Sequence, residues 1–499
     1  MASQAPASCT RGRRRTLWLA IAVLVLAGVL RFANIGWSYS NNGIDEGIMA
    51  ERAMLVRDGY ALYSDIPCDQ APFAFYLGAA LGGDLLLLRI LVAALSLAAV
   101  AACMFASKAI GGDRAMLITG LLLAADFAFV RESRLFSLDA LSSIFLAFSM
   151  AVMVRYLKDR SLGTLVVAGL LIGFSAATKL LGALGILGML AFLVLETRAG
   201  RRPRREGMVA AAVLVVTAAI PLLMYTIVLG PKEVYEGMVV GQSGRSADLY
   251  LKLSLVAYFG VNPAYVLPVL HARALWRADE RNRFLICVAA VVLVFMIVQP
   301  LLFFHHLVLL SPAMAILAGV AADRLLPREG KAEGGHQREL RRFEVPDHRV
   351  VLAVLLASLL VSYGLCAYGT VAQREPIQVK YARWLEEVTD PDEFVISGDP
   401  GIPAMAGRLV PPELVNVAYR QSGEVTLEDI ETAIVDYAPP VVIVCYRLNE
   451  VEGLEELLLE KGYSQIHMQI VGSDRAVLDL FEKGIGPVGI WIHVGTEGA

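Results

Sequence analysis

Long apolar runs separated by short polar segments fill the first three quarters of the chain. A helix needs roughly 20 mostly apolar residues to cross the hydrocarbon core of a bilayer. The runs that reach or approach this length lie near 17–37, 86–107, 115–130, 140–156, 162–178, 181–195, 208–229, 251–270, 284–302, 307–323 and 350–372. The pattern therefore predicts a mainly α-helical, polytopic membrane domain over residues 1–372, with about eleven transmembrane helices.

Composition excludes a soluble globular protein. The chain has 499 residues, of which 57% are apolar and 18% charged, and its mean hydropathy is +0.60. A soluble domain carries about 25% charged residues. We expect multi-pass insertion in the cell membrane.

The distribution of Lys and Arg predicts the orientation of the chain. With the N-terminus in the cytoplasm, the inner segments before residue 373 hold 25 Lys and Arg, and the outer segments hold 8. Cytoplasmic loops are enriched in these residues. The first run follows a basic stretch, "RGRRR", but no small-residue cleavage site follows it, so we expect a retained first helix rather than a signal peptide.

The composition changes after residue 372. Residues 373–499 contain 9 Lys and Arg against 22 Asp and Glu. Their pattern predicts helices at 377–389, 427–437 and 451–463, and strands at 393–397 and 440–446. We therefore predict a small, acidic α/β domain at 373–499, which lies outside the cell if eleven helices precede it.

Two outer loops are long. The first, 36–85, contains predicted helices near 46–58 and 72–82 that we expect to lie in the plane of the membrane interface. The second, 230–250, contains Gly and Ser and is expected to be mobile.

The first outer loop carries the stretch "NNGIDEGIMAERAM", in which Asp45 and Glu46 are adjacent. Paired carboxylates in a loop are commonly just solvated. Here Asp45 is predicted to precede a helix, where its side chain would cap exposed N–H groups and be held still. A carboxylate at the bilayer surface can accept a proton from an incoming hydroxyl as a general base.

Three further clusters of polar residues are predicted at outer turns, and for each the alternative is simple anchoring at the interface by snorkelling side chains. They contain Arg131, Glu132, Arg134 and Asp139; Lys179; and His305 with His306. Ionisable residues at membrane depth tend to mark function, and Arg binds phosphate with paired hydrogen bonds. Adjacent histidines cannot both face one metal from a regular helix, so we favour contacts to phosphate or hydroxyl groups.

All four clusters are predicted on the outer side of the membrane. Together they describe a base and an anion-binding cradle, which transfer from a phosphate-linked lipid would require.

The stretch "GIDEGIMAERAMLVRDGYALYSDIPCDQAPFAFYL" resembles the first outer loop of GT-C glycosyltransferases of the protein O-mannosyltransferase and aminoarabinose-transferase type. It contains Asp-Glu, a helix, a Gly-x-x-x-Tyr-x-Asp step ending in Tyr63 and Asp65, and a Pro before an aromatic residue. "SRLFSLDALSSIFLAFSM", "ATKLLGAL" and "HHLVLLSP" are similar to later motifs of the family. A departure is Gln70, where many relatives have Lys.

The resemblance implies roles for the residues that match the motifs. Asp45 would be the catalytic base, with Glu46 near the acceptor or the donor sugar. The contacts to donor phosphate or substrate would come from Arg131, Arg134, Asp139, Lys179, His305, His306, Tyr63, Asp65 and Gln70. The absence of Lys at position 70 would shift a phosphate contact to Lys179.

We therefore predict an inverting glycosyltransferase that moves a single sugar from a polyprenyl-phosphate donor to a hydroxyl of a protein, lipid or glycan on the outer face. The alternative is a transporter or flippase of lipid-linked sugars, although the chain shows no internal repeat, a frequent feature of transporters. No cofactor and no nucleic-acid partner is indicated, and a divalent metal at the carboxylates stays open. The six cysteines show no metal-ligand spacing; Cys68 and Cys445 are both predicted outside and we expect them unpaired.

Overall fold

The computed structural model describes residues 7–38, 43–241, 252–327, 348–372, 374–417, 425–466 and 488–493, with the side chains of 7–12 and of residue 43 left out. The first two residues of the stretch "NNGIDEGIMAERAM" and the second half of the loop at 230–250 therefore lie outside the described residues. The first half of that loop is helical, in α11 (Pro231–Tyr235) and a π-helical turn, η3 (Glu236–Val240).

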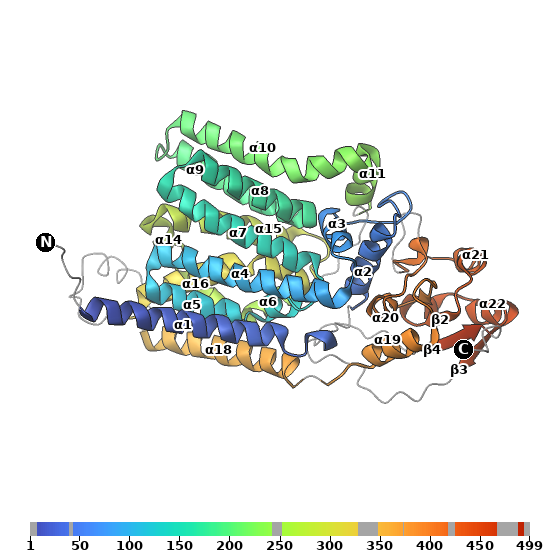
Figure 1. The fold of residues 1–499 in the computed structure, drawn as a ribbon. Coiled ribbons are helices and arrows are strands. Elements are labelled where there is room, and N and C mark those ends of the chain that lie inside the picture. The colour runs from blue at the N-terminus through green and yellow to red at the C-terminus, as the bar shows by residue number, and fades with distance from the viewer. Residues whose placement is uncertain are drawn as a thin grey trace.

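The membrane part is a bundle of helices that run side by side (Figure 1). Each predicted apolar run coincides with helix over most of its length. The bundle consists of α1 (Ala7–Phe32), α4 (Leu85–Gly111), α5 (Asp113–Ala124), α6 (Phe127–Glu132), α7 (Leu138–Asp159), α8 (Leu162–Thr178), α9 (Ala183–Arg198), α10 (Arg204–Leu229), α12 (Leu253–Val261), α13 (Val266–Leu270), α14 (Ala272–Ala278), α15 (Glu280–Val298), α16 (Ser311–Leu325) and α18 (His348–Thr370).

Seven helices among the described residues are long and apolar enough to cross a bilayer, or eight if one bent pair counts as a single span. The predicted number of about eleven stays a prediction, because several of the runs are too short or too interrupted to meet this length criterion. The run at 115–130 breaks at Asp126, whose side chain accepts a hydrogen bond from the Phe129 N–H at 2.8 Å and starts α6. The run at 251–270 bends by 103° before Pro263, because proline removes a backbone donor.

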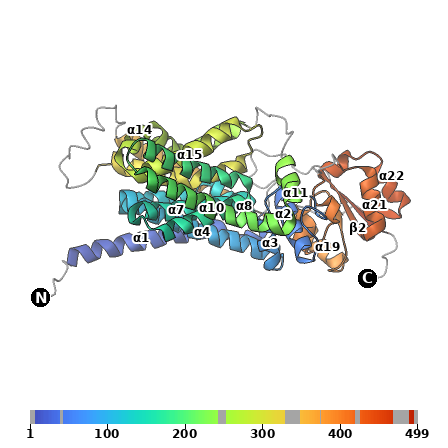
Figure 2. The same ribbon diagram turned by 90° about the horizontal axis from the view of Figure 1, so that it is seen from above.

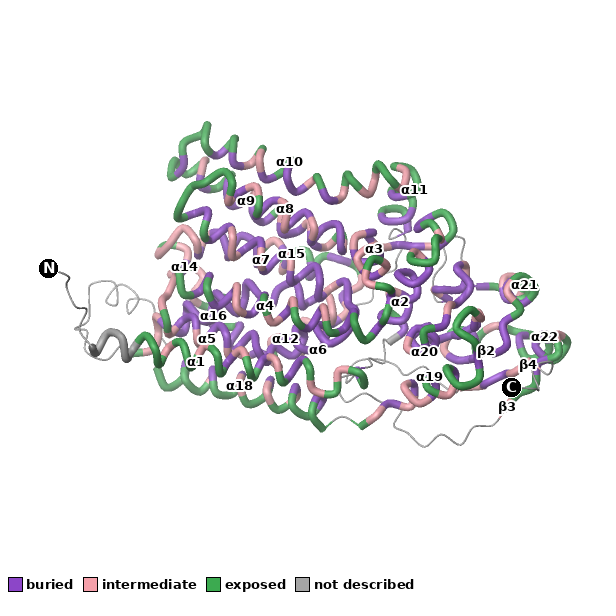
Figure 3. The backbone as a smooth tube through the Cα atoms, in the orientation of Figure 1, coloured by how far each residue is buried: buried purple, intermediate pink, exposed green. Residues whose placement is uncertain are grey.

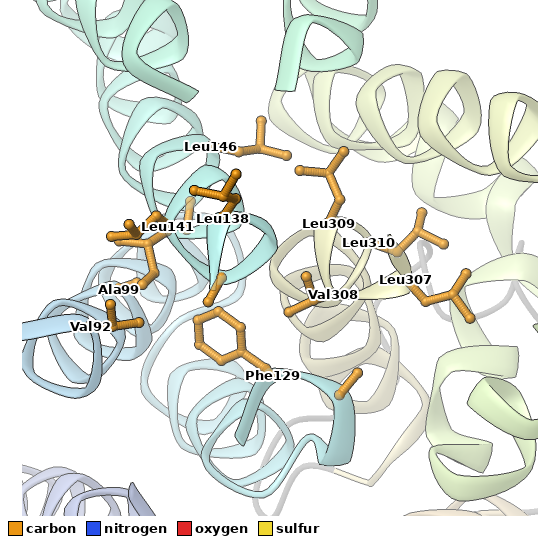
Figure 4. Close-up of a cluster of buried hydrophobic side chains, with 14 of the residues drawn as sticks. Val92, Ala99, Phe129, Leu138, Leu141, Leu146, Leu307, Val308, Leu309 and Leu310 are labelled. Atoms are coloured by element: carbon orange, nitrogen blue, oxygen red, sulfur yellow. The ribbon is translucent and has the colours of Figure 1, made fainter. Parts of the chain in front are cut away.

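Apolar side chains on the outer helices face outward. Ile227 and Val228 of α10 and Leu360 of α18 are among the most exposed large apolar residues, and these helices are exposed along much of their length (Figure 3). In water such surfaces would be unfavourable, so they indicate contact with lipid. The bundle interior is a continuous apolar core in which α4, α6, α7 and the 3-10 helix η6 (Phe304–Leu309) meet (Figure 4).

Helices α2 (Gly43–Arg57) and α3 (Phe73–Ala80) lie at one end of the bundle, between it and the C-terminal part of the chain (Figures 1 and 2). Both were predicted within a few residues. Nearly every described residue of α2 from Ile44 to Leu55 is buried or partly buried, and Asp45 is exposed. Protein therefore covers much of this helix, and its place in the membrane interface stays a prediction. A helix covered by protein on both sides shows the same apolar content as one resting on lipid.

The C-terminal residues form an α/β unit with a four-stranded sheet in the order β1-β2-β4-β3. Strands β1 and β2 are parallel, and β4 is antiparallel to both β2 and β3. The predicted helices at 377–389, 427–437 and 451–463 and both predicted strands are present, whereas α20, β3 and β4 were missed. The elements are α19 (Ile377–Val388), β1 (Ile396–Ser397), α20 (Gly401–Ala406), α21 (Leu427–Tyr437), β2 (Val441–Val444), α22 (Leu454–Glu460), β3 (Tyr463–Ile466) and β4 (Gly489–His493).

Helix α2 is the contact between the bundle and the α/β unit. A Cβ atom at Gly47 would lie 2.1 Å from the backbone nitrogen of Gly401, so only glycine permits this approach. One turn further along, the carboxylate of Glu51 accepts a hydrogen bond from the Val410 N–H at 3.2 Å. Burial raises the pKa of Glu51 well above its usual range, and this hydrogen bond and the charge of Arg57 oppose the rise. The unit is therefore fixed to α2 by close backbone packing and one buried carboxyl group.

Cys68 and Cys445, the two cysteines predicted outside, are free thiols, as expected. Cys68 and Cys445 are both buried. Burial raises the pKa of Cys68 to about 11 and that of Cys445 well above its usual range, so neither thiol ionises readily at neutral pH.

Candidate active site

Asp45 lies in the first turn of α2, not before the helix as the sequence had suggested. A carboxylate there is stabilised by the partial positive charge of the helix N-terminus. Its side chain is exposed on a helix that is largely buried, and it lines a cavity at the end of the bundle next to the α/β unit. Asp45 therefore has the position that a base acting on a molecule in this cavity requires.

Glu46 is adjacent in sequence but makes different contacts, because neighbouring residues on a helix point about 100° apart. It is buried, and its two carboxylate oxygens accept hydrogen bonds from Arg89 Nε and Nη2 at 2.8 and 2.6 Å. The Phe136 N–H donates a third at 2.8 Å. Glu46 thus binds the first turn of α2 to α4 and to the turn before α7, while it forms part of the cavity wall.

The turn between α6 and α7 separates two arginines that the sequence had grouped. Arg131 is buried and lines the cavity, with its Nη1 3.8 Å from Glu132 Oε1. Glu132 in turn accepts a hydrogen bond from the Ser137 hydroxyl at 2.6 Å. Arg134 is not among the cavity residues. Its guanidinium donates to the carbonyls of Leu30 and Arg31 at 3.1 Å, so it satisfies the C-terminal carbonyls of α1, and the expected phosphate contact from Arg134 does not fit the structure.

Asp139 and Lys179 come together across the cavity from the start of α7 and the end of α8. Lys179 Nζ donates to Asp139 Oδ2 at 2.6 Å, and His305 Nε2 lies 4.0 Å from the same oxygen. His305 is stacked on the ring of Phe303, and the ring of His306 stands edge-on to it. Both histidines line the cavity, so three predicted clusters converge on one carboxylate.

The Tyr-x-Asp step of the first loop holds the loop in shape. Tyr63 has a left-handed backbone with φ 77°, and its hydroxyl donates to the Gln70 carbonyl at 2.7 Å. The carboxylate of Asp65 accepts from the Ala61 N–H at 2.7 Å. Neither side chain lines the cavity, so the expected contacts of Tyr63 and Asp65 to substrate do not fit the structure. Gln70 does line the cavity, beside Asp69, which the sequence analysis missed.

The cavity has a volume of about 290 Å³ and is lined by seven separate parts of the chain. Its lining includes most of the predicted site residues, namely Asp45, Glu46, Gln70, Arg131, Asp139, Lys179, His305 and His306. The sequence analysis missed Asn416 and Tyr446, which the C-terminal α/β unit contributes. The expectation that four outer clusters meet at one site is therefore matched by their geometry.

A second, more apolar cavity of about 530 Å³ adjoins the first, because Asp69, Gln70, Lys179 and His306 line both. Its other walls are largely aliphatic and come from the start of α9, the end of α15 and the segment that follows it. They are Leu180, Leu181, Ala183, Leu184, Leu187, Met238, Phe295, Pro300 and Leu301, with Gln299 and Ala71. The pair of cavities thus joins a charged chamber to an apolar groove. Among the residues that the structure describes, no group of three or more His, Cys, Asp and Glu side chains is arranged to hold a metal ion.

Residues 69–225 match the family model described as "Dolichyl-phosphate-mannose-protein mannosyltransferase". This segment includes the cavity residues from Asp69 to Lys179. No curated protein matches the chain.

Solved structures resemble the whole chain. ArnT from Cupriavidus metallidurans in the apo state is 17% identical, with 99% of this chain and 100% of that one covered and a TM-score of 0.65. The same protein bound to undecaprenyl phosphate is 16% identical, with 95% and 97% covered and a TM-score of 0.64. The oligosaccharyltransferase AglB from Archaeoglobus fulgidus, in complex with an inhibitory peptide and a dolichol-phosphate, is 14% identical, with 91% and 73% covered and a TM-score of 0.58. The predicted resemblance to GT-C membrane proteins is confirmed at the level of the fold.

Proposed function

We propose that this GT-C-fold membrane protein is a glycosyltransferase that moves one sugar from a polyprenyl-phosphate donor to a hydroxyl acceptor. The observation that carries the proposal is the single cavity in which an exposed carboxylate, Asp45, faces a wall containing Arg131, Lys179 and His305. A base and a set of cations within one chamber supply what displacement of a lipid phosphate requires. The ArnT and AglB structures hold undecaprenyl phosphate and dolichol-phosphate, which supports a lipid phosphate as the leaving group.

The adjoining groove supports a lipid tail on the donor. Its aliphatic walls begin where the charged chamber ends, and Lys179 and His306 stand at the boundary. A polyprenyl chain lying in this groove would place its phosphate against these cations. Lys179 then takes over the phosphate contact that relatives make from the position of Gln70.

The reaction is a single inverting displacement. The acceptor oxygen attacks the anomeric carbon, its proton passes to the carboxylate of Asp45, and the bond from the anomeric carbon to the phosphate oxygen breaks. The electron pair leaves with the polyprenyl phosphate, whose charge Arg131 and Lys179 stabilise. Glu46 is a positioning residue here, because Arg89 and the Phe136 N–H already occupy its carboxylate.

We infer that this chemistry takes place on the outer face of the membrane. The N-terminus and the basic loops would lie in the cytoplasm, since the inner segments hold 25 Lys and Arg against 8 in the outer ones. Residues 373–499 would then form an extracytoplasmic α/β domain beside the transmembrane domain at 1–372. The comparisons give no support to the flippase alternative.

The test uses purified protein in liposomes with a panel of polyprenyl-phosphate sugars. Wild type should release polyprenyl phosphate from at least one donor, and Asp45→Asn should reduce the rate by roughly 10²–10⁴-fold, the usual contribution of a general base. The matched control is Asp58→Asn, which changes an exposed carboxylate at the other end of α2, away from the cavity residues. Equal activity of Asp45→Asn and wild type would disprove the role of Asp45.

A further inference from the structure

The charged residues of the catalytic chamber are divided unequally between its two sides. Every ionisable lining residue apart from the tyrosine comes from the membrane part of the chain, between Asp45 and His306. The C-terminal α/β unit contributes only Asn416 and Tyr446. The part of the chamber wall that the α/β unit forms is therefore polar and holds no carboxylate or cation, whereas residues 45–306 supply every carboxylate and cation of the lining.

Each of the two residues lies at or near a distinctive backbone feature of the α/β unit. Tyr446 follows β2 and has a left-handed backbone with φ 51°, which is an unfavourable conformation for a large side chain. Unfavourable backbone conformations of this kind cluster at ligand sites. Asn416 lies six residues after Val410, whose N–H is bonded to Glu51 of α2.

Strand direction gives an independent reason for a ligand at this position. Parallel strands β1 and β2 end at the same edge of the sheet, and Tyr446 lies just beyond the end of β2. The backbone there is tightly packed, since a Cβ atom at Gly398, after β1, would lie 2.0 Å from the Cys445 carbonyl oxygen. Ligands of open α/β sheets bind outside the carboxyl ends of parallel strands, and here that edge faces the chamber.

The geometry of an inverting displacement then assigns the two sides of the chamber. The nucleophile must approach the anomeric carbon opposite the leaving group. The leaving phosphate is tied to the bilayer by its lipid tail, so the acceptor hydroxyl must enter from the side away from the membrane. That side is the one occupied by the α/β unit (Figures 1 and 2).

We propose that Asn416 and Tyr446 bind the acceptor and determine its specificity, and that the acceptor presents a neutral sugar ring. This rests on the proposed transferase function. A carboxamide both donates and accepts hydrogen bonds, as ring hydroxyls do, and a tyrosine ring offers an apolar face with a polar tip. An acceptor that presents a charged headgroup at this position would find no complementary charge on this side.

The experiment separates binding of the acceptor from cleavage of the donor. Purified protein in liposomes would be given the donor that wild type cleaves, first alone and then with an alkyl glycoside or a Ser/Thr-containing peptide as probe acceptor. The variants are Asn416→Ala, Tyr446→Phe and Tyr446→Gly; the last removes the ring and also relieves the backbone strain. Asn449→Ala is the matched control, because Asn449 is an exposed residue of the same short helix, η8 (Tyr446–Glu450), and does not line the chamber.

We expect Asn416→Ala and Tyr446→Gly to raise the KM for the alkyl glycoside about tenfold or more, the effect of one or two lost neutral hydrogen bonds. Tyr446→Phe should have a smaller effect, and Asn449→Ala none. In Asn416→Ala and Tyr446→Gly the KM for the acceptor should rise more than the KM for the donor, a split that acceptor binding predicts and a merely structural role would not produce. If donor hydrolysis in Asn416→Ala and Tyr446→Gly fell as much as transfer to the acceptor, the proposal would be overturned and the transferase function would remain. Unchanged KM values for the acceptor in these variants would overturn the proposal in the same way. Transfer to the peptide but not to the glycoside would overturn the sugar-ring assignment, whereas loss of all donor cleavage in wild type would refute the proposed function itself.

Discussion

The buried pair of Glu46 and Arg89 gives a quantitative prediction about what holds Asp45 in place. Arg89 makes two charge-assisted hydrogen bonds to Glu46, at 2.8 and 2.6 Å, and both side chains are almost fully buried. The substitution Arg89→Met would remove both hydrogen bonds from the guanidinium and leave the Glu46 carboxylate buried, with the hydrogen bond from the Phe136 N–H retained. Removing one partner of a buried ion pair costs about 3–5 kcal/mol.

The double mutant Glu46→Gln/Arg89→Met should be more stable than Arg89→Met alone, because no buried charge is then left without its partner. We expect a coupling energy of about 2–3 kcal/mol, within the range for residues in direct contact. The free energy of unfolding would be measured by SDS titration in mixed micelles with tryptophan fluorescence as the signal. Arg155→Met is the control, because the Arg155 pair with Asp159 is exposed and should contribute nothing measurable. Additive effects of the two single substitutions would refute the claim that this pair fixes α2.

Three further predictions concern the junction and the phosphate site. Gly47→Ala should destabilise the protein and increase hydrogen exchange in residues 377–466, because the clash with Gly401 outweighs the ~1 kcal/mol that alanine gains in a helix. Gly364→Ala is the control, since Gly364 has open space around it. Equal hydrogen exchange in the two variants would refute the close contact between α2 and Gly401. Burial raises the pKa of Glu51 in the folded protein above its ordinary value of 4.5. The protonated Glu51 carboxyl group therefore contributes its full stabilisation below pH 4.5, and this contribution is lost as the pH rises through the folded-state pKa. Glu51→Gln should therefore make Tm less dependent on pH and raise Tm at pH values above the folded-state pKa of Glu51. Parallel curves of Tm against pH for the variant and the wild type would contradict this prediction. Lys179→Gln should lower kcat/KM for the donor roughly 10²-fold, the scale of one lost charge-assisted contact in the transition state. Lys179→Arg should recover part of this loss. An unchanged kcat/KM for the donor in Lys179→Gln would exclude a contact between Lys179 and the phosphate.

The sequence predicted the membrane helices and the convergence of the outer clusters because both depend on local signals. Apolar runs mark helices whatever their partners are, and the bias of Lys and Arg places Asp45, Lys179 and His305 on one side. The number of spans was less predictable. Asp126 and Pro263 break helices inside apolar runs, and their effect depends on which neighbours take up the freed backbone groups.

The errors at the site all involve tertiary contacts. Arg134 lies three residues from Arg131 and has the same chemistry, yet it binds the end of α1, which pattern alone does not reveal. Helix α2 is covered by an α/β unit that begins more than 300 residues later. Asn416 and Tyr446 are neither acids nor cations of the kind that suggested the other site residues, and the left-handed backbone of Tyr446 is visible only in the structure.

The most direct measurement of the central claim is the balance of products in one liposome reaction. A donor labelled in both the sugar and the lipid would be incubated with wild-type protein and an acceptor, and each product would be quantified and its anomeric configuration determined by NMR. The proposed mechanism predicts one polyprenyl phosphate released for every glycoside formed, with inverted configuration, and neither product in Asp45→Asn. Movement of intact donor across the bilayer with no released polyprenyl phosphate would contradict it and would make the protein a transporter.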